Sequence, residues 1–161
     1  MPPSASRPHC RNFELRGLVE SICRSLDRQM AAQGVRVDID IPAGQTLTAD
    51  GDMLRQAVAN LVVHAMDAMP GGGALVVTSS VGPTAVELEI ADSGPGLPAE
   101  AQHKGPGALC RTSEGTIDLG LAVVCRIADL HGGTVTAVNC PEGGAAFTLS
   151  IPRPAALEKA A

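Results

Sequence analysis

The stretch 50-DGDMLRQAVANLVVHAMDAMPGGG-73 predicts a helix with two distinct faces, around which the rest of the expected fold is arranged. Between Asp52 and Met69, apolar residues recur at three- and four-residue steps, as on the buried side of a helix. These residues are Leu54, Ala57, Val58, Leu61, Val62, Ala65 and Met69. Gln56, Asn60 and His64 form a second, polar stripe at four-residue steps. A proline and three glycines then end the helix.

A helix and a strand precede this stretch, and two strands follow it. Apolar residues recur at helical steps from Phe13, and Gly34 is a suitable residue to end that helix. The run 35-VRVDIDIP-42 alternates between apolar and polar residues, as a half-buried strand does. After the central helix, residues 74–81 and 85–92 predict two strands joined by a Gly-Pro-Thr turn.

The second half of the chain predicts a third helix and a closing hairpin. Residues 99–118 show little periodicity and contain several glycines, so we expect a mobile segment there. Residues 119–131 are apolar on nearly every side, which indicates a buried helix. Residues 132–139 and 144–152 predict two antiparallel strands. Helices combined with antiparallel strand pairs predict an α/β two-layer sandwich with a mixed sheet.

The chain has 161 residues, and its length and composition are those of a single folded domain. We expect residues 1–12 to form a flexible arm, 13–153 the domain and 154–161 a frayed tail. The net charge of −5 and the lack of a basic cluster argue against nucleic acid as a partner. No apolar run approaches the ~20 residues of a membrane span, and the first residues lack a secretory signal, so we predict a cytoplasmic location.

Three short patterns carry polar groups that suit a ligand, although each is weak alone. Asn60 and His64 could hold a ligand or a metal, or could simply face solvent. Asp92 ends a strand before Ser-Gly-Pro-Gly, where a carboxylate can accept a hydrogen bond from an amine such as that of adenine; an ordinary turn is the alternative. Gly120 begins the third helix, where free N–H groups and the helix dipole favour anions.

In this order and spacing, the three patterns closely resemble a known family. The stretches 50–73, 89-EIADSGPGLP-98 and 115-GTIDLGLAVVCRIADLHGGTV-135 are similar to the catalytic and ATP-binding domain of bacterial two-component sensor histidine kinases. That domain belongs to the gyrase- and chaperone-like (GHKL) ATPases, which share the Bergerat fold. The resemblance extends from Phe13 to Pro152. It implies a mixed, mostly antiparallel sheet that is covered on one face by three helices.

The resemblance also implies ATP or ADP as the cofactor, bound between the helices and a flexible lid. Asp92 would bind the adenine amino group, Asn60 would lie near magnesium and the phosphates as the catalytic residue, and Gly120 would face the phosphates. Asn60 and His64 occupy the positions expected to bind the metal. The full set of implied nucleotide-binding residues is Asn60, His64, Asp92, Gly94, Gly96, Leu97, Gly120 and Leu121.

His64 departs from the family pattern, which has a second asparagine at this position. That asparagine is expected to coordinate magnesium through its amide oxygen. Magnesium requires oxygen ligands, whereas an imidazole suits softer metals. His64 therefore argues against ordinary magnesium–ATP chemistry, and its larger ring could fill the site.

Two further departures lie on the phosphate side. The family sequence Gly-Thr-Gly-Leu-Gly-Leu is replaced by 116-TIDLGL-121, with Ile117 and Asp118 at a threonine and a glycine. Asp118 would cap the helix, a contribution of ~1 kcal/mol. Its charge would oppose a phosphate at roughly 5 Å by about 3 kcal/mol at a dielectric constant of about 20, on the order of a hundredfold in affinity. The phenylalanine-rich lid motif is replaced by 106-PGALCRTS-113, and Lys104 and Arg111 are the lid cations.

Three functions follow from the resemblance and its departures. The first is a histidine kinase domain that transfers the γ-phosphoryl group of ATP to a histidine on a dimerisation domain. Because no helical hairpin precedes Phe13, we expect a fragment or a stand-alone relative, with that domain or a response-regulator-like protein as partner. The second is a degenerate, non-catalytic module that binds a nucleotide or a protein. The third, an anti-sigma-type serine kinase, ranks last because the central helix is more similar to sensor kinases.

Overall fold

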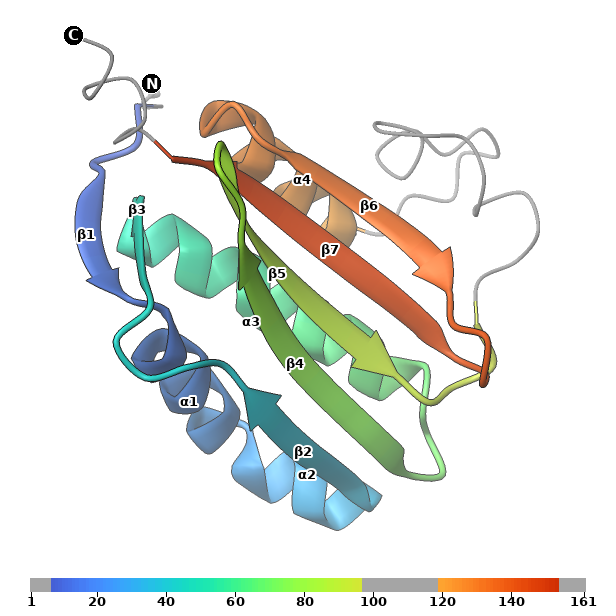
Figure 1. Ribbon diagram of the computed structural model, residues 1–161. Helices are drawn as coiled ribbons and strands as arrows, with labels where there is room; N and C mark the ends of the chain where they lie inside the picture. The colour runs from blue at the N-terminus through green and yellow to red at the C-terminus, as the bar shows by residue number, and fades with distance from the viewer. Residues whose placement is uncertain (1–6, 97–118, 154–161) are drawn as a thin grey trace, which may run out of the picture.

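The computed structural model describes residues 7–96 and 119–153, which form two layers (Figure 1). One layer is a sheet in the order β2-β4-β5-β7-β6, in which β2 is parallel to β4 and the other pairs are antiparallel. Its strands are β2 (Val35–Asp40), β4 (Gly73–Val81), β5 (Ala85–Asp92), β6 (Thr134–Asn139) and β7 (Ala145–Pro152). The predicted mixed, mostly antiparallel sheet is confirmed.

The second layer consists of helices that cover one face of this sheet (Figure 1). They are α1 (Leu15–Ser25), α2 (Asp27–Gln33), α3 (Gly51–Asp67) and α4 (Leu119–Leu130). None of the helices in the described part of the chain is long and apolar enough to cross a membrane.

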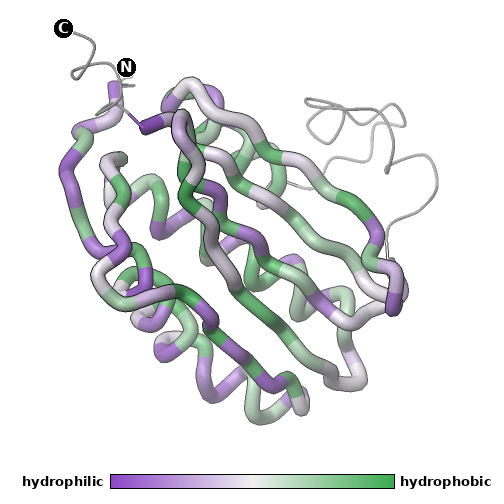
Figure 2. Tube along the Cα trace, in the orientation of Figure 1, coloured by the Kyte–Doolittle hydropathy of each residue, from purple (hydrophilic) through white to green (hydrophobic). Residues whose placement is uncertain are grey.

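The core lies between the two layers because the strands alternate. Val77 of β4 pairs with Ile90 of β5, which pairs with Phe147 of β7, and all three side chains are fully buried. From the helix layer, α3 adds Leu54, Val58 and Leu61 to this core, as its apolar stripe predicted. The edge strand β2 alternates between hydrophobic and hydrophilic residues (Figure 2), and its charged side chains are exposed. This edge is thereby protected from pairing with other chains.

The prediction of one helix from Phe13 to Gly34 is wrong in two respects. Residues 11–14 form a strand, β1 (Arg11–Glu14), which pairs antiparallel with a second unpredicted strand, β3 (Thr46–Ala49). The helix also breaks at Leu26, where φ is −105° and ψ is 9°. Four helices, instead of the three expected, therefore cover the sheet. Gly34 ends α2 with a φ of +82°, as predicted.

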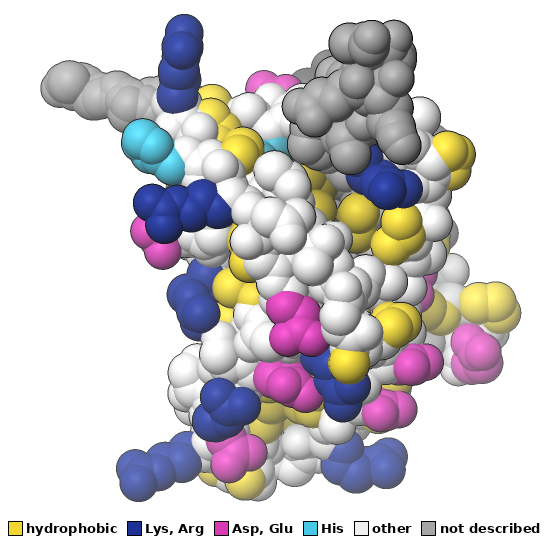
Figure 3. Space-filling model, turned by 60° about the vertical axis from the view of Figure 1, so that its left-hand side comes forward, with side chains coloured by type: hydrophobic (Ala, Val, Ile, Leu, Met, Phe, Trp, Pro, Cys, Tyr) yellow, Lys and Arg dark blue, Asp and Glu magenta, His cyan; other side chains and the backbone are white. Residues whose placement is uncertain are grey.

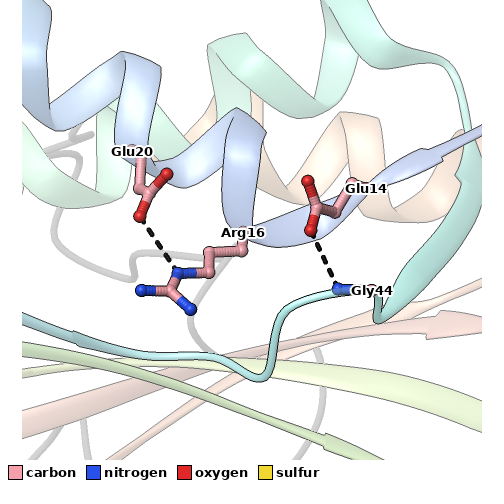
Figure 4. A network of polar contacts seen from close by, with 4 residues as sticks. All are labelled: Glu14, Arg16, Glu20 and Gly44. Carbon is pink, nitrogen blue, oxygen red and sulfur yellow. Dashed lines mark hydrogen bonds and ion pairs between the residues drawn. The ribbon is translucent and has the colours of Figure 1, made fainter.

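One polar contact connects Glu14, at the junction of β1 and α1, to the loop before β3, and a second lies within α1 (Figure 4). The Oε2 atom of Glu14 accepts a hydrogen bond of 2.8 Å from the backbone N–H of Gly44. Arg16 and Glu20 form a 3.0 Å ion pair on one side of α1. Both of these side chains are about 40% exposed, so the ion pair adds little stability. Glu14, in contrast, fixes the start of α1 to a distant loop.

The segment before β1 also contacts the domain. The backbone N–H of His9 donates a 2.8 Å hydrogen bond to Oδ2 of Asp50, the residue before α3. Arg11 and Asn12 pair with Ala49 and Thr48 in the β1–β3 ladder. Residues 9–12, which we expected in a flexible arm, are thus attached to the start of α3.

Candidate functional site

Asp92 is the last residue of β5, and only 6% of its surface is exposed. Its Oδ1 atom accepts hydrogen bonds from the backbone N–H groups of Gly94 and Ala145, at 2.9 Å and 3.3 Å. A buried carboxylate is costly unless hydrogen bonds replace its hydration, and these donors replace part of it. Within the described residues, both bonds reach the same oxygen. Oδ2 is therefore the atom that can accept a hydrogen bond from a ligand.

Two glycines allow other backbone segments to lie against the end of β5. A Cβ atom on Gly94 would lie 2.7 Å from the carbonyl oxygen of Ala68, directly after α3. A Cβ atom on Gly144 would lie 1.9 Å from the carbonyl oxygen of Asp92, and the φ of +92° there disfavours other residues. Gly144 was not among the residues predicted from the sequence, although the paired glycines before the last strand were a usable signal. The end of α3 and the β6–β7 turn thus enclose Asp92.

Gly96 is the last described residue of the loop after Asp92. Its φ is +91°, and an added Cβ atom would lie 2.8 Å from Oδ1 of Asn139 at the end of β6. Leu97 lies outside the described residues, as do the lid with Lys104 and Arg111 and the first half of the altered glycine box with Ile117 and Asp118. The expectations for these positions stay predictions.

Asn60 and Gly120 lie together although 60 residues separate them in the sequence. The Nδ2 atom of Asn60, in the middle of α3, donates a 3.2 Å hydrogen bond to the carbonyl oxygen of Gly120 in the first turn of α4. The side chain of Leu121 is 9% exposed and belongs to the core. Any contact of Leu121 with a ligand would therefore use its backbone.

His64 lies one turn after Asn60 on α3 and packs against the sheet. Its imidazole ring is 5.0 Å from the ring of Phe147, at an interplanar angle of 70°. This is the edge-to-face arrangement that aromatic rings favour. Phe147 is fully buried in β7, so the imidazole forms part of the contact between α3 and the sheet.

Comparison with known protein families identifies the family of this chain. Residues 49–155 match the family of histidine kinase-, DNA gyrase B- and HSP90-like ATPases. The chain belongs to this family. The resemblance inferred from the three sequence patterns is confirmed, and with it the general function of a histidine-kinase-type ATPase domain.

Two sensor kinases are similar to this chain and are longer than it. The chain is 32% identical over 149 residues to the adaptive-response sensory kinase SasA of Synechococcus sp. (strain CC9311), and the match covers 88% of this chain and 39% of that protein. It is 31% identical over 137 residues to the sensor protein KdpD of Escherichia coli (strain K12), covering 81% of this chain and 15% of that protein. The chain thus spans well under half the length of these relatives.

Solved structures show the same fold. The catalytic domain of histidine kinase ThkA superposes with a TM-score of 0.79 at 24% identity, covering 89% of this chain and 97% of that one. Full-length ShkA in complex with AMPPNP gives a TM-score of 0.78 at 23% identity, covering 92% of this chain and 32% of that one. The predicted Bergerat fold is confirmed.

The described residues of this ATPase domain do not fit a magnesium ion in the way the family pattern implies. Asn60 offers one amide oxygen, and the imidazole of His64 lies against Phe147. Magnesium demands an octahedral set of oxygen ligands. Waters and substrate phosphates supply part of that set, so the amide oxygen of Asn60 suits the ion, whereas the imidazole nitrogen of His64 does not. We therefore assign no step to a metal ion.

A cavity of about 810 Å³ lies apart from these residues, between β1, α1 and the start of α3. Its lining includes Phe13, Leu18, Asp50 and Arg55, and none of the predicted nucleotide-binding residues. Figure 3 views the molecule from the side of β1 and α1, where acidic and basic side chains are interspersed. Such mixed charge does not select an anionic ligand.

Proposed function

We propose that this domain binds an adenine nucleotide through Asp92 and transfers the γ-phosphoryl group of ATP to a histidine on a dimerisation domain. The geometry of Asp92 carries the proposal. Two backbone N–H groups hold Oδ1, so Oδ2 is kept in place to accept the exocyclic N–H of adenine. A hydrogen bond to a charged group contributes roughly 1.5–3 kcal/mol. Adenine is recognised in this way because its amino group donates where a carboxylate accepts.

The phosphates would extend from Asp92 toward Asn60 and the first turn of α4. Backbone N–H groups at a helix start favour anions. Asn60 holds the carbonyl of Gly120 and so fixes this turn against α3. In the transfer, the bond between the γ-phosphorus and its bridging oxygen breaks, ADP leaves, and a phosphorus–nitrogen bond forms at the imidazole. The domain contributes by positioning and electrostatics, as in other phosphoryl transfers.

A second candidate function is a nucleotide-binding module with impaired transfer, and His64 favours it. The adenine side of the site keeps its carboxylate and its glycines, whereas the position that should supply a metal ligand carries an imidazole packed on Phe147. Such a module would act through protein contacts. The ThkA structure in complex with response regulator protein TrrA, similar at 24% identity, suggests a response regulator as the partner to test.

Calorimetric titration with ADP and with AMPPNP, each with and without magnesium, tests both candidates. We expect Asp92→Asn to weaken ADP binding at least tenfold, because an amide N–H would face the adenine amino group. The matched control is Asp38→Asn, which changes an exposed carboxylate on β2 and should bind as the wild type does. Equal binding by Asp92→Asn and the wild type would contradict the adenine assignment.

The same titration separates the two candidates. A functional kinase domain should bind AMPPNP more tightly with magnesium than without it, and should phosphorylate an added dimerisation domain of a related kinase. An impaired module should bind ADP at least as tightly as AMPPNP, and magnesium should have no effect. Absence of binding by both nucleotides would reject nucleotide recognition altogether.

A further inference from the structure

A hydrogen bond connects the start of α3 to the end of α4. The backbone N–H of Asp50 donates to Nε2 of His131 at 3.0 Å. On the other side of the ring, Nδ1 lies 2.8 Å from the carbonyl oxygen of Ile127. Nε2 must accept and Nδ1 must donate, so these partners require the neutral tautomer with its proton on Nδ1. His131 thus connects the last turn of α4 to another helix.

The side chain of Asp50 makes this junction rigid. Its Oδ1 atom accepts a 3.1 Å hydrogen bond from the N–H of Met53 and so caps α3, while Oδ2 accepts from His9. Burial acts to raise the pKa of Asp50, but hydrogen bonds from backbone N–H groups outweigh it and hold the pKa below its usual value. The charged carboxylate is thereby stabilised, and the N–H of Asp50 is held beside His131.

The hydrogen bond between Asn60 and Gly120 is a second link between the same helices. Asp50 and Asn60 are ten residues apart, about 15 Å along a helix, and Gly120 and His131 are eleven residues apart, about 16 Å. The spacing of the two links along α3 therefore matches their spacing along α4. The two helices run antiparallel, and one link lies at each end of the contact between them.

Between the two links, α3 and α4 pack on each other, and both contribute apolar side chains to the core. The buried residues of α4 are Leu121, Val124, Ile127 and Ala128, and the residues that α3 buries over the same length include Leu54, Ala57, Val58 and Leu61. Burial of apolar surface is not directional, so it resists separation of the helices more than sliding. Shifts of 1–2 Å between packed helices are a common conformational change. Directional hydrogen bonds at both ends oppose such a shift.

We propose that His131 is a positioning residue that sets the axial register of α4 against α3 and so places the first turn of α4 beside Asn60. This inference deepens the proposed function, because that turn is expected to face the phosphates, and its effect on nucleotide binding rests on that function. The register itself can be measured in the nucleotide-free protein.

The test compares His131→Ala and His131→Gln with the wild type by NMR spectroscopy and amide hydrogen exchange. In His131→Ala, we expect the Asn60 side-chain amide and the Gly120 backbone amide to shift, and the Val123 and Val124 amides to exchange at least tenfold faster. His131→Gln should recover most of the wild-type behaviour, because the glutamine oxygen can accept from Asp50. Asp129→Ala, at an exposed position near the same helix end, is the matched control and should leave these signals unchanged.

Wild-type signals at Asn60, Gly120 and Val124 in His131→Ala would overturn the proposal and leave His131 as a local contact. If His131→Ala fails to fold, the reciprocal variant Asn60→Ala decides, because loss of the other link should shift the His131 ring and Asp50 amide signals. An unchanged His131 ring in Asn60→Ala would overturn the proposal as well.

Nucleotide titration then tests the functional consequence. His131→Ala should bind AMPPNP about tenfold more weakly than the wild type, with recovery in His131→Gln. Should the wild type itself bind no nucleotide, the proposed function fails, while the NMR comparison still decides the register.

Discussion

Asp50 and Asp92 are the buried charged side chains among the described residues, and the structure uses them differently. Asp50 lies before α3, and its two oxygens accept from two different backbone N–H groups, those of Met53 and His9. Asp92 lies at the end of β5, and both of its backbone hydrogen bonds reach Oδ1. Both oxygens of the first carboxylate are used by the fold, whereas Oδ2 of the second lies outside these bonds and is the atom that we propose for adenine. On this proposal, burial is common to the structural and the functional carboxylate, and the distribution of their hydrogen bonds separates them.

The surroundings of the two carboxylates differ as well. Asp92 is enclosed by backbone that approaches closely because Gly94 and Gly144 lack side chains. Asp50 is next to Gly51, where an added Cβ atom would make only an ordinary contact with the ring of Phe13. The region of Asp92 should therefore tolerate much less change than the region of Asp50.

Substitution of Gly144 should give the largest effect. In Gly144→Ala, the added Cβ atom would meet the carbonyl oxygen of Asp92, and the φ of +92° is strained for alanine. We expect a loss of about 3 kcal/mol in the free energy of unfolding, measured by urea denaturation. Gly143→Ala is the matched control, because its φ of +109° is also strained but its Cβ atom would meet nothing within 4 Å. Equal losses in the two variants would show that the contact with Asp92 is unimportant.

A double substitution on the phosphate side of the proposed site should raise the affinity for ATP. His64→Asn with Asp118→Gly restores an amide oxygen and removes a negative charge, and we expect ATP affinity to rise at least tenfold, about 1.4 kcal/mol. Calorimetric titration with AMPPNP and magnesium measures the change. Loss of the edge contact with Phe147 should also lower the stability of His64→Asn by about 1 kcal/mol. Unchanged affinity in the double variant would contradict our explanation of both positions.

The sequence predicted those parts of the fold and site that depend on local patterns. The apolar stripe of α3, the apolar character of α4 on nearly every side and the alternation of β2 were sufficient because each pattern lies within one element. Asp92 could be singled out because it ends a strand before glycines. The grouping of Asn60, Asp92 and Gly120 came from the family resemblance.

Features that depend on contacts between distant residues were not predictable in this way. The pairing of Arg11 with Ala49 gave no periodic signal, because β1 is mostly exposed and only four residues long. The hydrogen bond between Asp50 and His131 spans 81 residues. The approach of Gly144 to Asp92 likewise exists only after the sheet has formed.

The smallest expected effect concerns the free energy of unfolding as a function of pH, which should reveal how the fold uses the charge of Asp50. The pKa of Asp50 lies below its ordinary value of 3.8. Its charge therefore contributes stability that is fully present above that value and is lost as the pH falls through the folded-state pKa. Asp50→Asn keeps a capping oxygen but not the charge, so the wild type should be more stable by about 1 kcal/mol at pH 6. Urea denaturation from pH 6 to pH 3 should show this difference shrinking below about pH 4.

Asp38→Asn, at an exposed site, serves as the control for this series. Its free energy of unfolding at pH 6 should equal that of the wild type, because the Asp38 side chain is exposed on β2. A difference between the wild type and Asp50→Asn that grows on acidification would mean that the Asp50 carboxylate is destabilised by the fold. In that case the contrast between a carboxylate used by the fold and one kept for a ligand would no longer separate Asp50 from Asp92.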